Sequence, residues 1–393
     1  MKNFFVPLLI ALVSFSSFSC KAKVNSPEKI KVGAESMEKY LPKLEGKRVG
    51  LVINHTSTVG KTHLLDTLLS RQVNVAKLFA PEHGFRGQAD AGAHILNETD
   101  AQTGLPIISL YGKNRKPSAE HLSGIDILVF DIQDVGVRFY TYISTLHNII
   151  EAAANNNIPV LVLDRPNPNG HYVAGPVLEE GYESFVGMNK IPVVYGLTIG
   201  ELAIMINEEK WASKKHCDLE VIPCENYTHA SRYDLPIKPS PNLPNAQSIW
   251  LYPSICFFEP TKVSVGRGTD LQFQVIGGPD KNLGRYKFTP VDKPGAHNPV
   301  NKDILCYGEN LSDVDARNMG FDLHYLFNFY KNFEDKANFF TNERFFNLLT
   351  GNGWLIEDLK AGKTVAEVES KWQPALEKFK TLRKKYLIYP DFK

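Results

Sequence analysis

Short, almost continuous apolar segments alternate along the first 225 residues with longer segments whose apolar residues recur every three to four positions. The short segments are typical of strands covered on both faces of a parallel sheet, and the longer ones of amphipathic helices. Strands are predicted at 47–54, 74–79, 107–110, 125–130, 159–163 and 219–223. Helices are predicted at 62–70, 141–155 and 198–210, the last opened by Thr198 and Glu201 as a capping box. This alternation predicts an α/β fold with a Rossmann-like doubly wound parallel sheet.

The alternation stops at a proline-rich segment, 235–253, within which a helix is predicted to begin at 248–251. A strand is then predicted at 271–276, and Trp372, Leu376, Phe379, Leu382 and Tyr386 stand at helical spacing. The remainder is therefore predicted to be a smaller α+β C-terminal domain. The predicted division is a signal peptide at 1–19, a lipoprotein tether at 20–44, a Rossmann-like catalytic domain at 45–265 and the α+β domain at 266–393.

The first residues have the features of an export signal. A basic start, 1–3, precedes an apolar run, 4–13, and a small-residue segment, 14–19, that leads to Cys20. The run is shorter than the roughly 20 residues of a membrane-spanning helix. Cys20 in this position resembles a lipobox, so we expect a lipidated, periplasm-facing protein of the cell envelope, in the outer or the inner membrane. Ordinary cleavage, which would give a secreted protein, is the alternative.

Charge and cysteine content exclude several classes of protein. Lys and Arg number 44 against 43 Asp and Glu, which leaves no electrostatic footprint for nucleic acid. We therefore expect no nucleic-acid partner, and membrane contact only through a lipid at Cys20. No two cysteines form a CxxC pair, which disfavours a zinc ribbon or a redox site. Cys217 and Cys224 either form a disulfide or are simply buried like the other two.

Polar side chains follow four of the predicted strands at the point where each strand ends. In open α/β sheets the ligand site lies at the carboxyl ends of the strands, so these side chains predict an active site along one edge of the sheet. The four strand ends carry Asn54-His55, then Pro81-Glu82-His83-Gly84-Phe85-Arg86-Gly87, then Asp131-Ile132-Gln133-Asp134, and finally Asp164-Arg165-Pro166-Asn167.

Glu82 is the leading candidate for a general acid or base. A carboxyl group at a strand end, beside Phe85, has its pKa raised when it loses water. His83 and Arg86 act in the opposite direction because they favour the ionised form. The structural alternative is a turn residue paired with Arg86.

The other strand-end residues have both functional and structural interpretations. Asp131 and Asp134, followed by Arg138, suit a divalent metal, a sugar hydroxyl or the cap of the next helix. Tyr140 and Tyr142 suit a sugar-stacking face or core packing. The rigid loop that holds Asp164 and Asn167 presents polar side chains to a ligand, or Asp164 forms an ion pair with its neighbour Arg165.

Arg267 stands between two glycines in a second candidate binding loop. Its planar fork suits a carboxylate or a phosphate, and an ion pair with Glu259 or Asp270 is the structural alternative. Nucleotide-binding glycine loops, the GxSxG elbow of α/β-hydrolases and HxxxH zinc spacing do not occur in the sequence.

Taken in order, five motifs resemble those of the exo-β-N-acetylmuramidases called NamZ, a family earlier catalogued as a bacterial domain of unknown function. The resemblance runs from about Lys47 to the C-terminus. It implies an exo-acting glycosidase that releases N-acetylmuramic acid from the non-reducing end of peptidoglycan fragments, with its site between a Rossmann-like part and a smaller C-terminal part. The motifs are 81–87, 131–142, 164–170, 252–254 and 265–270.

By motif position, the family's catalytic glutamate corresponds to Glu82. Glycosidases use a pair of carboxyl groups, and Asp131, Asp134, Asp164 and Glu259 are candidates for the second, with His83 as a possible assistant. The substrate's lactyl carboxylate suggests Arg267 or Arg138 as a clamp. The residues expected to bind substrate are His55, Arg86, Asp134, Arg138, Tyr142, Asp164, Asn167 and Arg267.

Such acid–base chemistry requires no cofactor and no metal. Three rival interpretations stay open at this point. The first is an exo-glycosidase with a different amino-sugar preference, the second a non-catalytic peptidoglycan-binding lipoprotein, and the third a metal-dependent hydrolase that uses Asp131, Asp134 and Asp164.

Overall fold

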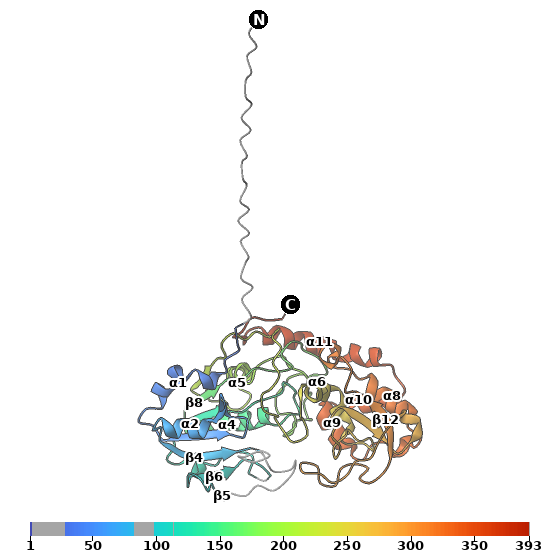
Figure 1. Ribbon diagram of the computed structural model, residues 1–393, viewed down its shortest axis with the longest axis horizontal. Helices are drawn as coiled ribbons and strands as arrows, with labels where there is room; N and C mark the ends of the chain where they lie inside the picture. Colours follow the sequence, from blue (N-terminus) through green and yellow to red (C-terminus); the bar gives the residue numbers. More distant parts are fainter. Residues whose placement is uncertain (2–27, 82–97, 113, 393) are drawn as a thin grey trace.

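The computed structural model describes Met1 and residues 28–81, 98–112 and 114–392. The predicted signal peptide, Cys20, Glu82, His83 and Arg86 lie outside these ranges, and their roles stay predictions. Figure 1 shows the α/β part of the chain on one side and the C-terminal helices with a small sheet on the other. No helix in the described ranges has the length and apolar character needed to cross a membrane.

A sheet of seven strands, counted in the described ranges, forms the centre of the α/β part. Its order is β5-β6-β4-β1-β7-β8-β9, and every neighbouring pair is parallel except β5 with β6 at one edge. This arrangement confirms the predicted Rossmann-like parallel sheet. The strands are β1 (Val49–Ile53), β4 (Val75–Ala80), β5 (Glu98–Thr99), β6 (Pro106–Ser109), β7 (Ile127–Asp131), β8 (Val160–Leu163) and β9 (Leu219–Ile222).

Helices cover both faces of this sheet, as the continuous apolar strands require. Successive residues of β1 illustrate this, because Leu51 packs in one core with Leu65 while Val52 packs in the other with Leu146. The helices of this part are α1 (Met37–Leu44), α2 (Leu64–Ser70), α3 (Ala119–Leu122), α4 (Tyr142–Asn156) and α5 (Ile199–Glu208), with the short 3₁₀ turn η1 (Gly33–Glu35).

The sequence predicted the start of one helix correctly and the start of another incorrectly. The capping box at α5 is confirmed, because Thr198 Oγ1 accepts from the Glu201 amide at 3.2 Å and the Glu201 carboxylate accepts from the Thr198 amide at 2.9 Å. The helix predicted at 62–70 begins only at Leu64, after a small hairpin formed by β2 (Thr58–Val59) and β3 (Thr62–His63). This hairpin was missed because a strand of two residues is too short to show the alternation of apolar and polar residues by which strands are predicted.

The C-terminal part combines helices with a three-stranded antiparallel sheet in the order β10-β12-β11. The prediction of a strand at 271–276 is wrong for 271–274: the strand begins at Val275, and Phe273 has a φ of 52°. The strands are β10 (Val275–Gly278), β11 (Tyr286–Phe288) and β12 (Cys306–Asn310). The helices are α6 (Ala246–Ile255), α7 (Ala316–Met319), α8 (His324–Asn332), α9 (Glu343–Thr350), α10 (Trp354–Lys360) and α11 (Val365–Arg383), with 3₁₀ turns η2 (Cys256–Phe258), η3 (Lys281–Leu283) and η4 (Lys336–Asn338).

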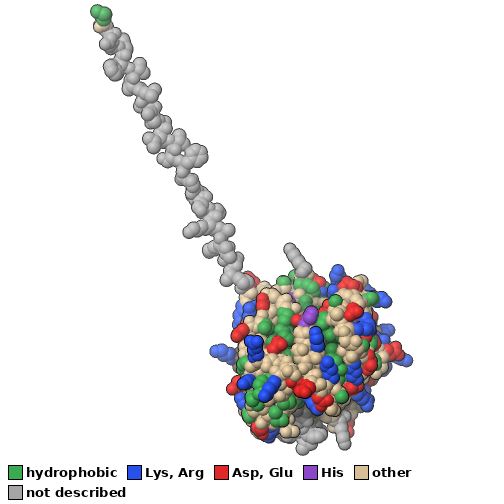
Figure 2. Space-filling model, turned by 90° about the vertical axis from the view of Figure 1, so that its right-hand side faces the viewer, with side chains coloured by type: hydrophobic (Ala, Val, Ile, Leu, Met, Phe, Trp, Pro, Cys, Tyr) green, Lys and Arg blue, Asp and Glu red, His purple; other side chains and the backbone are tan. Residues whose placement is uncertain are grey.

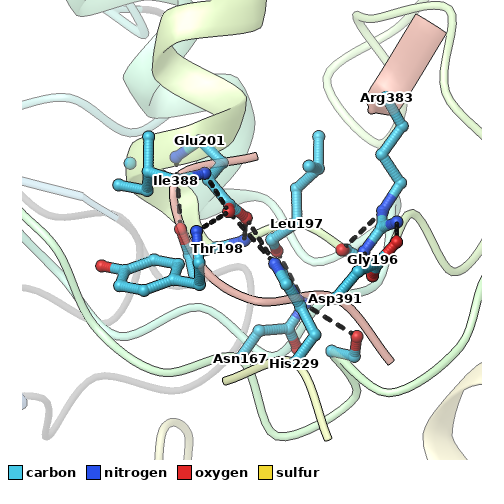
Figure 3. A network of polar contacts seen from close by, with 12 residues as sticks. Asn167, Gly196, Leu197, Thr198, Glu201, His229, Arg383, Ile388 and Asp391 are labelled. Atoms are coloured by element: carbon cyan, nitrogen blue, oxygen red, sulfur yellow. Dashed lines mark hydrogen bonds and ion pairs between the residues drawn. The ribbon is translucent and has the colours of Figure 1, made fainter. Parts of the chain in front are cut away.

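After α11 the chain returns to the α/β part and is fastened there by buried polar contacts (Figure 3). Arg383 donates to the Gly196 carbonyl at 2.8 Å and forms an ion pair with Asp391 at 2.8 Å. The buried carboxylate of Glu201 accepts from the Ile388 amide at 2.9 Å and contacts His229 at 3.0 Å. These contacts join the C-terminal segment of the chain to the α/β part. They therefore hold the C-terminal part in place relative to the sheet.

The cysteines in the described ranges are buried and free. The alternative of a disulfide between Cys217 and Cys224 is therefore wrong, and burial raises the pKa of both thiols. The sulfur atoms behave as small apolar groups in this core.

Candidate active site

The strand order reverses between β1 and β7, and this point determines where the site lies. From β1 the chain continues to β4 and β6 on one side of the sheet, whereas β7, β8 and β9 extend on the other side. Loops diverge at such a switch point and leave a crevice at the carboxyl ends of the strands. Asn54 follows β1 directly and Asp131 ends β7, so both residues lie at the crevice.

Side-chain hydrogen bonds tie the two strand ends together. Asn54 Oδ1 accepts from the amide and the hydroxyl of Thr56 at 2.9 and 2.6 Å, and Thr56 Oγ1 accepts from the Gln133 amide at 3.0 Å. The side-chain amide nitrogen of Asn54 is buried and has no hydrogen-bond partner among the described residues. The floor of the crevice is therefore rigid, and an unpaired buried donor such as this one is costly unless a ligand or water uses it.

Asp131 forms a buried ion pair with Arg165. The Arg165 guanidinium donates to both carboxylate oxygens at 2.5 and 2.8 Å, and it also donates to the Thr58 carbonyl at 3.0 Å. The side chains of Asp131 and Arg165 are 0% and 4% exposed. This bidentate contact joins the ends of β7 and β8, and it occupies the oxygens that a catalytic or metal-binding Asp131 would use.

Asp134 is also buried, but its carboxyl group is only partly satisfied. One oxygen accepts from the Gly136 amide at 2.6 Å and from the Tyr195 hydroxyl, while the other oxygen has no hydrogen-bond partner in the part of the chain that the structure describes. Burial raises the pKa of Asp134 to about 6, against the lowering effect of these hydrogen bonds. Burial thus favours the protonated form of Asp134 more strongly than that of an ordinary carboxyl group.

This raised pKa predicts a pH-dependent stability difference. A carboxyl group with a higher pKa in the folded chain binds protons more tightly there, so stability falls as pH rises from about 4 to about 6. Relative to wild type, Asp134→Asn should gain about 2 kcal/mol between pH 4 and pH 7. Urea unfolding at the two pH values measures this gain. The exposed Asp313→Asn should show no change, and equal behaviour of the two variants would contradict the assignment.

Asp164 and Asn167 are held inside the fold. The carboxylate of Asp164 accepts from the amide of Gly200 and from the hydroxyls of Thr198 and Tyr389, at 2.6–2.8 Å. Burial raises the pKa of Asp164 to about 6. Among the described residues Asp164 forms no ion pair with Arg165, so that alternative is wrong. The Asn167 side-chain amide donates to the Leu197 carbonyl at 2.7 Å, and its oxygen accepts from a neighbouring amide.

Arg138 lies in the interior and links the two parts of the chain. Its side chain is 0% exposed, and its guanidinium donates to the carbonyls of Pro176 and Ile191 at 2.7 and 2.9 Å and to those of Leu349 and Thr350 at 3.0 and 2.7 Å. The first two carbonyls belong to the α/β part and the other two to the end of α9. The structure does not bring Arg138 to the crevice, and a clamp on substrate is not accessible to it in this geometry.

A small hollow of about 80 Å³ lies where the two parts meet, and we call it the interdomain hollow. Three motifs from the sequence converge on it. The residues that matter for its chemistry are Tyr140, Tyr142, Asn242, Tyr252, Arg267 and Phe273.

The proline-rich segment forms one wall of the interdomain hollow, and strand-end residues hold it in place. His55, after β1, donates to the Lys238 carbonyl at 2.9 Å, and the Tyr140 hydroxyl donates to the Pro239 carbonyl at 2.8 Å. Tyr142 packs edge-on against Tyr140 at 5.0 Å between ring centroids. His55 thus positions the wall, while Tyr142 contributes an aromatic surface to the hollow.

Arg267 faces the interdomain hollow from the C-terminal part. It is ion-paired with Glu259 at 2.6 and 3.2 Å and lies over the ring of Phe273 at 5.2 Å. Asp270 pairs with Lys293 instead. The side chain of Arg267 is 26% exposed, and the second terminal nitrogen of its guanidinium has no partner among the described residues. Arg267 therefore keeps donors for an anionic group in the hollow.

Sequence reasoning missed several residues of this region. Tyr195, which donates to Asp134, lies 61 positions away and carries no local signal. Asn242 lies in the proline-rich segment, in which the sequence analysis singled out no binding residue. The prolines were nevertheless a usable signal, because a stiff loop near the strand ends can form one wall of a binding site. Within the described ranges no three His, Cys, Asp or Glu side chains lie together as a metal site requires.

Comparison with known proteins identifies the family. Residues 49–247 match the family model described as exo-beta-N-acetylmuramidase NamZ, N-terminal, and residues 250–389 match its C-terminal counterpart. The peptidoglycan beta-N-acetylmuramidase NamZ of Bacillus subtilis (strain 168) is 36% identical over 414 positions, which cover 97% of each chain.

Two crystal structures of DUF1343 family proteins from Bacteroides fragilis NCTC 9343 resemble this fold. The first is 47% identical with a TM-score of 0.85, and the second is 34% identical with a TM-score of 0.79. Each alignment covers 92% of this chain and 99% of the other. Three observations point to the same family. They are the shared architecture, the motifs that converge on the interdomain hollow and the matches along nearly the whole sequence. The chain belongs to the exo-β-N-acetylmuramidase NamZ family.

Proposed function

We propose that this protein is an exo-β-N-acetylmuramidase, a glycoside hydrolase that releases N-acetylmuramic acid from the non-reducing end of peptidoglycan fragments. The observation that carries this proposal is the match to both NamZ family models and to the Bacillus subtilis enzyme over 97% of the chain. The interdomain hollow supports it, because aromatic rings and an arginine with spare donors suit a sugar that carries a carboxylate.

Glu82 is proposed as the general acid or base. In the sequence it comes two residues after the end of β4, a strand that pairs directly with β1 beside the switch point, and the carboxyl ends of such strands are where ligand sites form. A glycosidase acid gives a proton to the departing glycosidic oxygen, and a base takes a proton from the attacking water. Both tasks require a carboxyl group at this edge.

Asp134 is proposed as the second carboxyl group. Of the four candidates, Asp131 and Glu259 are each bound through both oxygens by an arginine. Asp164 has hydrogen-bond donors at both of its oxygens. Only Asp134 combines a free oxygen, among these four, with a pKa of about 6. A raised pKa of this kind brings a carboxyl group closer to the pH at which acid–base catalysis is efficient.

Arg267 is proposed to recognise the lactyl carboxylate of the muramic residue. Arg267→Ala should raise the KM for an N-acetylmuramic acid β-glycoside about tenfold or more, since hydrogen bonds to charged groups contribute about 1.5–3 kcal/mol. The constant for inhibition by free N-acetylglucosamine, which has no lactyl group, should not rise. Steady-state kinetics of the muramic substrate, with and without this inhibitor, measure both quantities, and exposed Arg344→Ala is the control. A parallel rise of both constants would mean that Arg267 does not recognise the lactyl group.

The cellular location is proposed from the sequence. An apolar segment of export type that ends at Cys20 supports a lipid anchor on the periplasmic side of a membrane. In a bacterial host, wild type should sediment with membranes and incorporate a labelled fatty acid, whereas Cys20→Ser should do neither. Labelling that persists in the variant would argue against lipidation at Cys20.

A further inference from the structure

The C-terminal part contains a second cavity that has no described lining residue in common with the interdomain hollow. It has a volume of about 540 Å³, which lies within the usual range of ligand sites. The start of α11, α8 and α10 enclose it, and we call it the lysine pocket. Its distinguishing residues are Phe327, Tyr330, Lys331, Lys336, Lys360 and Lys363.

Positive charge dominates the lysine pocket. None of its described lining residues is acidic. Lys360 is paired with Glu343 at 2.8 Å, and Lys363 with Asp358 at 2.7 Å. Asp358 also contacts the further cation Lys371, so one carboxylate faces two ammonium groups. Figure 2, which shows the face of the C-terminal part, has several Lys and Arg side chains close to a histidine and beside apolar side chains.

Lys331 and Lys336 carry the excess charge. Both side chains are exposed, and neither forms an ion pair with any residue in the described ranges. Their ammonium groups therefore keep all their donors for a ligand. Lysines that line the same cavity repel each other, and an anion that binds between them removes this repulsion.

The form of the cavity indicates the kind of anion. Lysine ammonium groups act as separate point charges, whereas the planar fork of an arginine matches a single carboxylate or phosphate with two parallel hydrogen bonds. Here the charges are distributed around a cavity with an aromatic wall formed by Phe327 and Tyr330. This arrangement suits an extended chain that bears several separate carboxylates and small apolar groups. The stem peptides of peptidoglycan suit this arrangement, since they are extended chains that combine alanine residues with several free carboxylates.

We propose that the lysine pocket binds the stem peptides of peptidoglycan and so retains the polymer on the enzyme while its end is processed. This inference rests on the proposed function, because peptidoglycan is the substrate in that proposal. It assigns the C-terminal part a role in substrate retention that is separate from the chemistry at the interdomain hollow.

The test is binding to insoluble peptidoglycan, with and without prior removal of the stems by an amidase, by wild type and by Lys331→Gln/Lys336→Gln. Both lysines are exposed, so the double variant should fold normally. On peptidoglycan with stems, the variant should bind roughly fivefold more weakly. On stripped glycan, the two proteins should bind equally, and the wild type should lose affinity when the stems are removed. The control is Lys378→Gln/Lys384→Gln, which removes the same charge from exposed positions outside the pocket.

Three results would overturn the inference. They are equal binding of wild type and variant to stem-bearing peptidoglycan, an equal loss in the control variant, and a wild-type affinity that does not depend on the stems. Turnover of a small chromogenic muramic glycoside, measured on the same preparations, separates the two proposals. Normal turnover without stem-dependent binding rejects only the lysine pocket, whereas binding without any turnover rejects the proposed enzyme.

Discussion

Replacement of Arg138 by methionine is expected to lower the free energy of unfolding by about 3–5 kcal/mol. The guanidinium supplies the side-chain donors for four buried carbonyls, and methionine, which has a similar length, supplies none. Because a whole domain is stable by only about 5–15 kcal/mol, this is a large share of the total. Two of the carbonyls belong to residues 349 and 350, so the contact between the two parts should weaken as well.

Urea denaturation followed by circular dichroism measures the change. Arg344→Met provides the matched control, because Arg344 lies on α9 near the same junction but is exposed. That variant should stay within about 0.5 kcal/mol of wild type. If Arg138→Met were as stable as the control, the carbonyls would have other donors and the linking role of Arg138 would be wrong.

Replacement of Glu82 by glutamine should lower kcat on a muramic glycoside by about a hundredfold or more. Positioned acid–base groups contribute about 10²–10⁴ in rate, and glutamine keeps the shape of glutamate but cannot exchange the proton. KM should change less than kcat, because the proton is transferred in the transition state.

Glu120→Gln is the control for this loss. It makes the same chemical change at an exposed position of α3, in the same part of the chain, and should leave kcat unchanged. Equal activity of Glu82→Gln and wild type would transfer the role of proton donor to another residue. Asp134 would then be the first to examine.

Much of the fold was predictable because parallel strands that are buried on both faces appear in the sequence as short, nearly continuous apolar runs. Leu51 and Val52 are adjacent, and both are buried in different cores, which only a strand covered on two sides allows. The strand predicted at Leu271 was partly wrong for a related reason. Phe273 is 1% exposed although its backbone is not extended, and a buried aromatic residue in a turn looks like a strand residue in the sequence.

The location of the site was more predictable than the partners of its residues. Side chains at strand ends lie along one edge because the topology requires it. Asp131, however, pairs with Arg165, which is 34 positions away, whereas the alternative of an ion pair between Asp164 and Arg165 is not found among the described residues. Neighbouring side chains on extended backbone point in opposite directions, so adjacency in sequence was a poor guide. The interior position of Arg138 could not be inferred either, because its carbonyl partners come from distant segments.

The central claim is that the protein hydrolyses a muramic glycoside by means of Glu82. The most direct measurement is release of p-nitrophenol from the β-glycosides of N-acetylmuramic acid and N-acetylglucosamine, by soluble protein that starts after Cys20 and by its Glu82→Gln variant. We expect turnover of the muramic substrate alone, and its loss in the variant. Folded protein that releases p-nitrophenol from neither substrate would contradict the claim and favour a peptidoglycan-binding lipoprotein. Preferential turnover of the N-acetylglucosamine substrate would instead indicate an exo-glycosidase of different specificity.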